Sequence, residues 1–202
     1  MDEILPGILH WTAYHEGIRQ PVHSYFLSGP AALVDPMLPE EGLDFFQGGS
    51  RPERILLTNR HHYRHSARYV DAFGCPVLCQ QSGLHEFEGG PRVEGFSFGD
   101  EVAPGVLARE VGAICPEETA LHLTEGDGVM AFADGVIRDR EGGLGFVPDY
   151  LLGDDPEGVK LGLRESFRRL LEHDFDTLLM AHGAPMVGGG KAALRELAET
   201  EP

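Results

Sequence analysis

The sequence predicts a mixed α/β (α+β) domain, and three observations support that fold class. Residues 55–79 have a strand, helix, strand order, which favours a parallel sheet. From residue 102 onward, short strand-like runs alternate with tight turns. Helical patterns recur at intervals that would cover sheets on both sides. No linker divides the chain, so we expect a single domain over residues 1–202.

The first expected elements are a β-hairpin and a short helix. Residues 22–28 and 31–34 are apolar runs joined by Gly29 and Pro30, a dipeptide typical of turns. Residues 40–47 then have the pattern of a short helix. The hairpin should contribute antiparallel strands to a sheet.

A strand, a loop and a helix follow. Residues 55–57 form a continuous apolar run, as in a strand that is buried on both faces. Ala67, Val70 and Phe73 recur at helical spacing, and residues 77–79 begin the next strand. The polar segment between strand and helix is therefore a loop at a strand end, where several side chains can be aimed at one point.

The second half of the chain combines short strands, a long loop and two helices. Strands are expected over residues 106–111, 119–123, 129–133 and 177–181. Residues 138–155 are rich in Gly, Pro and Asp and should form a long surface loop. Asp155 and Pro156 are typical of a helix start. The apolar face of that helix comprises Val159, Leu163, Phe167, Leu170 and Leu171, and residues 191–198 form the terminal helix.

Charge narrows the range of partners. The chain has 33 acidic and 16 basic residues, a formal net charge of −17, which repels phosphate backbones and anionic membrane surfaces. We therefore expect no nucleic-acid or membrane partner, but a small-molecule substrate or ligand. An anionic ligand stays open, because five arginines gather in one short segment: Arg51, Arg54, Arg60, Arg64 and Arg68.

Cysteine usage and the N-terminus indicate a reduced, cytoplasmic protein. The three cysteines, Cys75, Cys79 and Cys115, form no disulfide-like framework, and residues 1–3 lack the pattern of an export signal. Cys75 and Cys79 could form one ligand pair of a zinc ribbon, but the sequence has no second Cys or His pair at the spacing that such a site requires. Cys75 and Cys79 are therefore expected in the core.

The densest group of chemically active side chains lies in residues 58–65, directly after the buried strand. It contains three histidines and two arginines, and imidazole is the commonest metal ligand in proteins. This loop is therefore the expected site of chemistry.

The loop resembles the Thr-His-x-His-x-Asp-His loop of the metallo-β-lactamase superfamily, with Thr58 in register. Residues 33–36, 130–135 and 178–185 resemble further landmarks of that family and occur in the right order. The resemblance covers residues 22–187 and implies a four-layer αββα sandwich.

In this register, the positions that hold two metal ions in the family fall on Asn59, His61, Tyr63, Arg64, Ile114, Asp134 and His182. The motif is degenerate, because His61, Asp134 and His182 alone keep residue types expected to ligate. The resemblance therefore implies at most a mononuclear site for zinc, iron or manganese, rather than a dinuclear centre.

The resemblance implies a metal-dependent hydrolase of an ester, thioester or amide. In that mechanism the ion lowers the pKa of its water, and Asp134 orients the water. Arg60 or Arg64 would stabilise the developing oxyanion.

Two alternatives without metal use the same residues. Arg64 beside Asp134 would replace the charge of the metal by an ion pair and leave a non-catalytic binding protein with no cofactor. Alternatively, Arg60 and Arg64 would form an anion-binding clamp for a carboxylate or phosphate.

The neighbours of His61 have their own expected roles. A shift of the loop by one residue would present His62 or His65 in place of His61 or Asn59; otherwise both histidines are solvated residues at a helix start. Tyr63 is expected to pack against the sheet. The resemblance implies that Asp35 supports the loop through hydrogen bonds to its backbone; otherwise it is an ordinary Asp-Pro turn residue.

Overall fold

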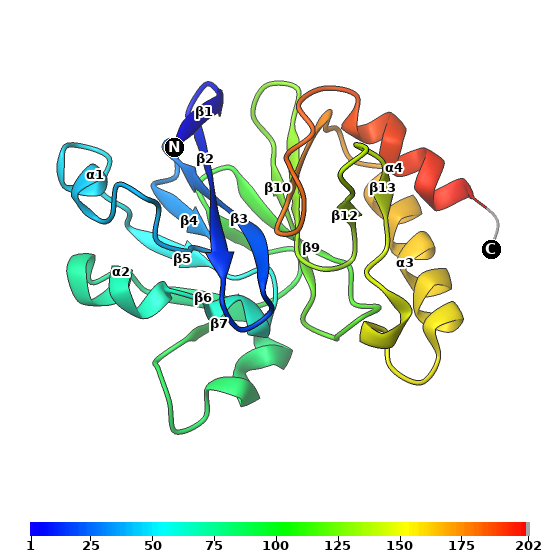
Figure 1. Cartoon of the computed structure of the whole chain (residues 1–202), viewed down its shortest axis with the longest axis horizontal. Coiled ribbons are helices and arrows are strands. Elements are labelled where there is room, and N and C mark those ends of the chain that lie inside the picture. Colours follow the sequence, from blue (N-terminus) through cyan, green and yellow to red (C-terminus); the bar gives the residue numbers. More distant parts are fainter. Residues whose placement is uncertain (201–202) are drawn as a thin grey trace.

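The computed structural model describes residues 1–200 as two β-sheets packed face to face, with helices on both outer sides. Figure 1 shows α1 and α2 outside one sheet, and α3 and α4 outside the other. The layers therefore run helix, sheet, sheet, helix. This arrangement confirms the αββα sandwich that the family resemblance implies.

The first sheet has seven strands, and their order in space is their order in sequence. They are β1 (Asp2–Leu5), β2 (Ile8–His15), β3 (Gln20–Leu27), β4 (Ala32–Val34), β5 (Arg54–Leu56), β6 (Val77–Gln80) and β7 (Glu94–Phe96). Strands β1 to β4 pair antiparallel, whereas β4 to β7 pair parallel. The expected hairpin and the expected strand, helix, strand unit are both confirmed.

The second sheet has the spatial order β14-β11-β10-β9-β8. Its strands are β8 (Glu101–Ala103), β9 (Val106–Glu110), β10 (Thr119–Leu123), β11 (Val129–Phe132) and β14 (Thr177–Met180). Strands β8 to β11 form the expected antiparallel meander, and β14 pairs parallel with β11. The carboxyl ends of β11 and β14 therefore lie side by side at the same end of this sheet.

The α-helices are α1 (Asp44–Gln47), α2 (Ser66–Phe73), α3 (Pro156–Leu170) and α4 (Gly190–Glu199). Helix α3 begins as expected, because the Asp155 side chain accepts a hydrogen bond from the Gly158 N–H at 3.0 Å. The helix expected over residues 40–47 is shorter than predicted, since Gly42 has a left-handed φ of 68° that a helix cannot include. Within residues 1–200, no helix has both the length and the apolar character needed to span a membrane.

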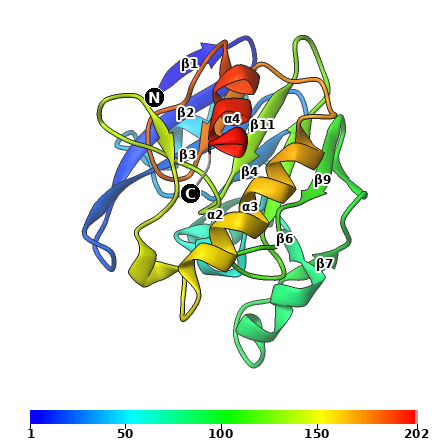
Figure 2. The same cartoon turned by 90° about the vertical axis from the view of Figure 1, so that its right-hand side faces the viewer.

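Three apolar cores hold the four layers together. Between the sheets, Tyr25, Val34 and Leu56 pack with Leu121 and Leu179. Another core lies under α1 and α2, and the last lies under α3 and α4, which Figure 2 shows from outside. All three cysteines are buried and unpaired, which confirms the core positions predicted for Cys75 and Cys79.

The segment over residues 138–155 is more regular than the loop that the sequence predicts. Strands β12 (Ile137–Arg138) and β13 (Leu144–Gly145) pair antiparallel, and a short 3₁₀ helix, η3 (Asp149–Leu151), follows. Arg138 fixes this hairpin, because its side chain donates to the carbonyls of Gly142 at 3.1 Å and Pro185 at 2.7 Å. The sequence did not predict this hairpin, because each of its strands is only two residues long and shows no apolar periodicity.

Candidate metal centre

Chemically active residues follow the carboxyl ends of three strands and lie together at one end of the sandwich. His62 lies in the loop after β5, which belongs to the first sheet. Asp134 lies two residues beyond the end of β11, and His182 two residues beyond the end of β14, both in the second sheet. Because β11 and β14 are parallel neighbours, Asp134 and His182 emerge side by side.

A 3₁₀ turn after β5 decides which histidine faces the interior. Asn59 caps the helix η1 (Arg60–Tyr63), and its side-chain oxygen accepts a hydrogen bond from the His61 N–H at 3.0 Å. This turn leaves His61 exposed and buries His62, which is 5% exposed. His61 therefore lines the surrounding pocket without joining the inner cluster.

The inner cluster consists of His62, Asp134 and His182. One potential ligand atom from each residue lies within 4.8 Å of the others. His182 Nε2 lies 3.0 Å and His62 Nε2 lies 3.6 Å from the same carboxylate oxygen, Asp134 Oδ1. Asn59 Nδ2 donates to the second oxygen, Asp134 Oδ2, at 2.6 Å. No other group of three metal-ligating side chains occurs within residues 1–200.

Asp35 orients His62 from behind the cluster. Its buried carboxylate accepts hydrogen bonds from the Thr58 N–H at 2.9 Å and from the Thr58 hydroxyl. It also lies 2.9 Å from His62 Nδ1, so that His62 Nε2 faces Asp134. The expected hydrogen bond between the loop backbone and Asp35 is confirmed, with the Thr58 N–H as the donor. A carboxylate on the distal nitrogen of a histidine is the usual support of a metal-ligating imidazole.

The charges of the cluster are strongly interdependent. Burial alone would lower the pKa of His62, but the Asp35 carboxylate, with a smaller effect from Asp134, raises it to about 9. Burial opposes ionisation of Asp134, but the charge of His62 and the hydrogen bond from His182 hold its pKa well below the usual range. In the absence of a metal ion, a protonated His62 therefore lies between two carboxylates.

Glu118 is a member of the site that sequence reasoning missed. This fully buried residue accepts a hydrogen bond from the Asp134 N–H at 3.1 Å and another from the Gly135 N–H. Burial, followed by the charge of Asp134, raises the pKa of Glu118 to about 8. The side chain fixes the turn that carries Asp134. Its one sequence signal is an acidic residue directly before a strand that is buried along most of its length.

The two arginines of the loop, Arg60 and Arg64, do not have the partners that the sequence analysis expects. Arg64 does not form the expected ion pair with Asp134; its Nη1 donates to the carbonyls of His23 and Asp35, each at 2.8 Å. The side chains nearest the Asp134 carboxylate are instead the imidazoles of His62 and His182. Arg60 pairs with the buried Glu117 and lies 3.7 Å from Glu86. Both guanidinium groups are therefore engaged by the protein, although Arg64 Nη2 keeps no partner within residues 1–200.

The other residues of the loop have structural contacts. Tyr63 packs against Phe87, with ring centroids 5.8 Å apart, as expected of a packing residue. His65 precedes α2, and its Nδ1 accepts a hydrogen bond from the Leu38 N–H at 2.9 Å. The solvated helix-start role expected for His62 is wrong, because Asp35 draws that side chain into the interior.

The cluster opens into a pocket of about 680 Å³. Five of the apolar residues that line this pocket are called the apolar wall: Ile18, Ile114, Val147, Tyr150 and Leu151. Three of these side chains are strongly exposed: Tyr150 at 79%, Leu151 at 55% and Ile18 at 48%. The hairpin between β2 and β3 and the segment around η3 thus present apolar surface at the mouth of a polar site.

Comparisons with known proteins give a fold. No family model and no curated protein matches the sequence. Among solved structures, a metallo-β-lactamase family protein from Thermus thermophilus matches with a TM-score of 0.69 and 17% identity, over 97% of this chain and 79% of that one. The protein TTHA1623, solved in a di-iron-bound form, matches with a TM-score of 0.62 and 24% identity over 91% of both chains. A metallo-β-lactamase from Erythrobacter litoralis matches with a TM-score of 0.68 and 14% identity, over 98% of this chain and 95% of that one.

These similarities extend across the chain and agree with the resemblance that the sequence motifs carry. The chain therefore has the metallo-β-lactamase fold. At such low identities the similarity does not extend to a reaction or a substrate.

Proposed function

We propose that this chain is a metal-dependent hydrolase that uses a single ion, held by His62, Asp134 and His182, to cleave an ester, thioester or amide. The observation that carries this proposal is the convergence of two imidazole nitrogens and a carboxylate oxygen in the lining of a pocket. Three protein ligands with open positions are characteristic of catalytic rather than structural metal sites.

The donor set fits one ion. Two histidines and one carboxylate suit zinc or iron, and manganese to a lesser extent. A second ion has no such set, because the nearby Asn59 and Arg64 are already occupied by hydrogen bonds to Asp134 and to carbonyl groups. When bound, the ion supplies Lewis acidity, which lowers the pKa of a water and polarises a carbonyl group.

The protein's own residues would prepare this chemistry in three ways. Asp35 holds His62 in one ring orientation, and Glu118 fixes the turn of Asp134. Arg64 lines the pocket and would donate to a developing oxyanion, although its Nη2, which has no partner within residues 1–200, is itself buried; Arg60 is neutralised by Glu117. The engaged arginines and the apolar wall favour a neutral substrate with an apolar acyl group.

Elemental analysis of protein purified without a metal-binding tag tests the proposal. We expect about one zinc, iron or manganese ion per chain, with metal and ester hydrolysis lost together in Asp134→Asn. The matched control is Asp154→Asn, an exposed residue outside the pocket. A wild-type protein that stays metal-free after incubation with each of the three ions would contradict the proposal.

The apolar wall gives a prediction about substrate affinity. Tyr150→Ala is expected to raise KM for p-nitrophenyl butyrate about fivefold and to leave kcat unchanged, because the exposed ring contributes binding and no chemistry. Tyr14→Ala is the control, since Tyr14 is similarly exposed but does not line the pocket. Steady-state kinetics of both variants check the prediction, and equal KM values for the two would contradict it.

A metal-free binding protein is the second candidate. It is favoured by the surroundings of the Asp134 carboxylate, which already has polar partners. Asn59 donates a hydrogen bond to it, and the His182 and His62 imidazole nitrogens lie 3.0 Å and 3.6 Å from it. A site of this kind needs no ion for charge balance. The elemental analysis separates the two candidates, because the metal-free protein would contain no metal and would show no hydrolysis that chelators inhibit.

A further inference from the structure

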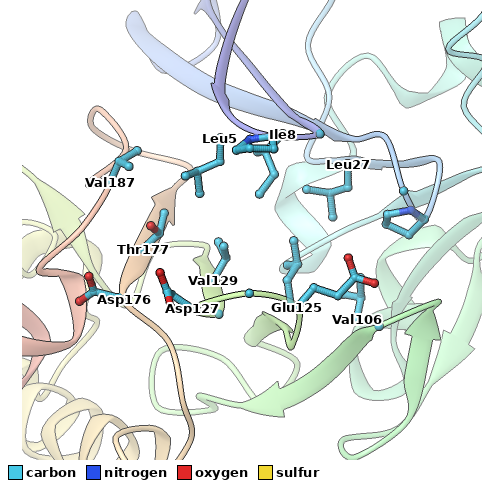
Figure 3. Close-up of a pocket in the computed structure, with 18 of the residues that line it drawn as sticks. Leu5, Ile8, Leu27, Val106, Glu125, Asp127, Val129, Asp176, Thr177 and Val187 are labelled. Carbon is cyan, nitrogen blue, oxygen red and sulfur yellow. The ribbon is translucent and has the colours of Figure 1, made fainter.

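A second cavity lies at the opposite end of the sandwich from the metal centre. It has a volume of about 560 Å³, and Figure 3 shows it between the two sheets. Val129 and Thr177 begin β11 and β14, whereas Asp134 and His182 follow the ends of the same strands. The two sites therefore share strands but have no lining residue in common.

The floor of this cavity is apolar and is built by both sheets. Ile8 and Leu27 come from β2 and β3, and Val106 and Val129 come from β9 and β11. These four side chains are 1–7% exposed. The exposed Val187 extends the apolar surface to the rim (Figure 3). A ligand in this cavity would thus bury an apolar part between the two sheets.

The rim of the cavity carries carboxylates, and no basic residue lines the cavity to balance their negative charge. Glu125, Asp127 and Asp176 are exposed carboxylates around the opening, and the lining residues include no Lys, Arg or His (Figure 3). Asp176 accepts a hydrogen bond from the Gly189 N–H at 3.0 Å. Within residues 1–200, none of the three carboxylates lies within 4.0 Å of a cationic side chain. The opening therefore repels anions and attracts a positively charged group.

We propose that this cavity binds a small amphiphile with a cationic amine head and an apolar tail. The buried floor accommodates the tail, and the rim carboxylates pair with the ammonium group at the opening. The volume lies in the usual range for sites of small ligands, roughly 300–1,000 Å³. This site is independent of the proposed hydrolase, because it uses none of its residues.

Three ligands with the same tail and different heads test the charge requirement. Isothermal titration at pH 7 is expected to give octylamine an affinity about fivefold higher than that of 1-octanol, with octanoate weakest of the three. The preference for the amine should shrink at about 1 M salt, where charges are screened over roughly 3 Å. Octanol or octanoate binding as tightly as octylamine would overturn the proposal.

A pair of charge-neutralising variants tests the location. Glu125→Gln combined with Asp127→Asn is expected to bring octylamine down to the affinity of octanol and to leave octanol unchanged. Asp71→Asn combined with Glu88→Gln changes the net charge equally at exposed positions outside the cavity and should leave all three affinities unchanged. Equal losses in the two double variants, or octylamine-induced NMR shifts confined to the His62 cluster, would overturn the proposal.

Discussion

His62→Ala is expected to weaken metal binding by more than about 100-fold, whereas His61→Ala should leave it nearly unchanged. The two residues are adjacent in one loop, but only His62 points its Nε2 toward Asp134 and His182. His61 is exposed in the same 3₁₀ turn and lines the pocket without joining the cluster. Competition with a chromogenic chelator measures both affinities.

This pair of variants is self-controlled, because each removes one imidazole from the same turn. Thermal unfolding of both proteins verifies that the loop still folds. If His61→Ala lost the metal and His62→Ala kept it, the ligand set taken from the family register would be correct. The structural assignment of His62 would then be wrong.

Asp35→Asn is expected to reduce the free energy of unfolding by about 3–5 kcal/mol, the usual cost of breaking a buried charge pair. Asp35 is 2% exposed and is the carboxylate closest to His62 Nδ1, at 2.9 Å. Asparagine keeps the size and can still accept from the Thr58 N–H, so the loss reports on the charge and on the acceptor oxygen that faces the Thr58 hydroxyl and His62 Nδ1. Urea denaturation of the chelator-treated protein measures it.

The control for this variant is Glu88→Gln, which neutralises an exposed carboxylate without an ion-pair partner in residues 1–200. We expect it to change stability by no more than about 0.5 kcal/mol. A loss below about 1 kcal/mol in Asp35→Asn would show that the charge of Asp35 is not needed to hold His62 in place.

Local sequence signals predicted much of the fold. The turn at Gly29 and Pro30 and the cap at Asp155 mark elements that the structure confirms, because turn and cap preferences depend on a few neighbouring residues. The short strands β12 and β13 were not predicted, because two-residue strands have no periodicity to detect.

The candidate site was predicted less completely, for a geometric reason. Asp134 and His182 follow directly from their strands, so their direction is set by the sheet. His61 and His62 lie in a turn that points successive side chains in different directions, and a register taken from a motif cannot decide between them. Glu118 was missed because its role depends on the turn at Asp134, which is remote in sequence.

The origin of the cluster in both sheets has a consequence for how the chain can be divided. A fragment that ends before β8 would carry Asp35 and His62, and the complementary fragment would carry Asp134 and His182. Neither fragment contains a complete site. A chain cleaved between the two sheets would regain the site only when its halves reassociate through the apolar core between them. Both halves of the chain are thus needed to form the site, so metal binding would report whether the two fragments have assembled.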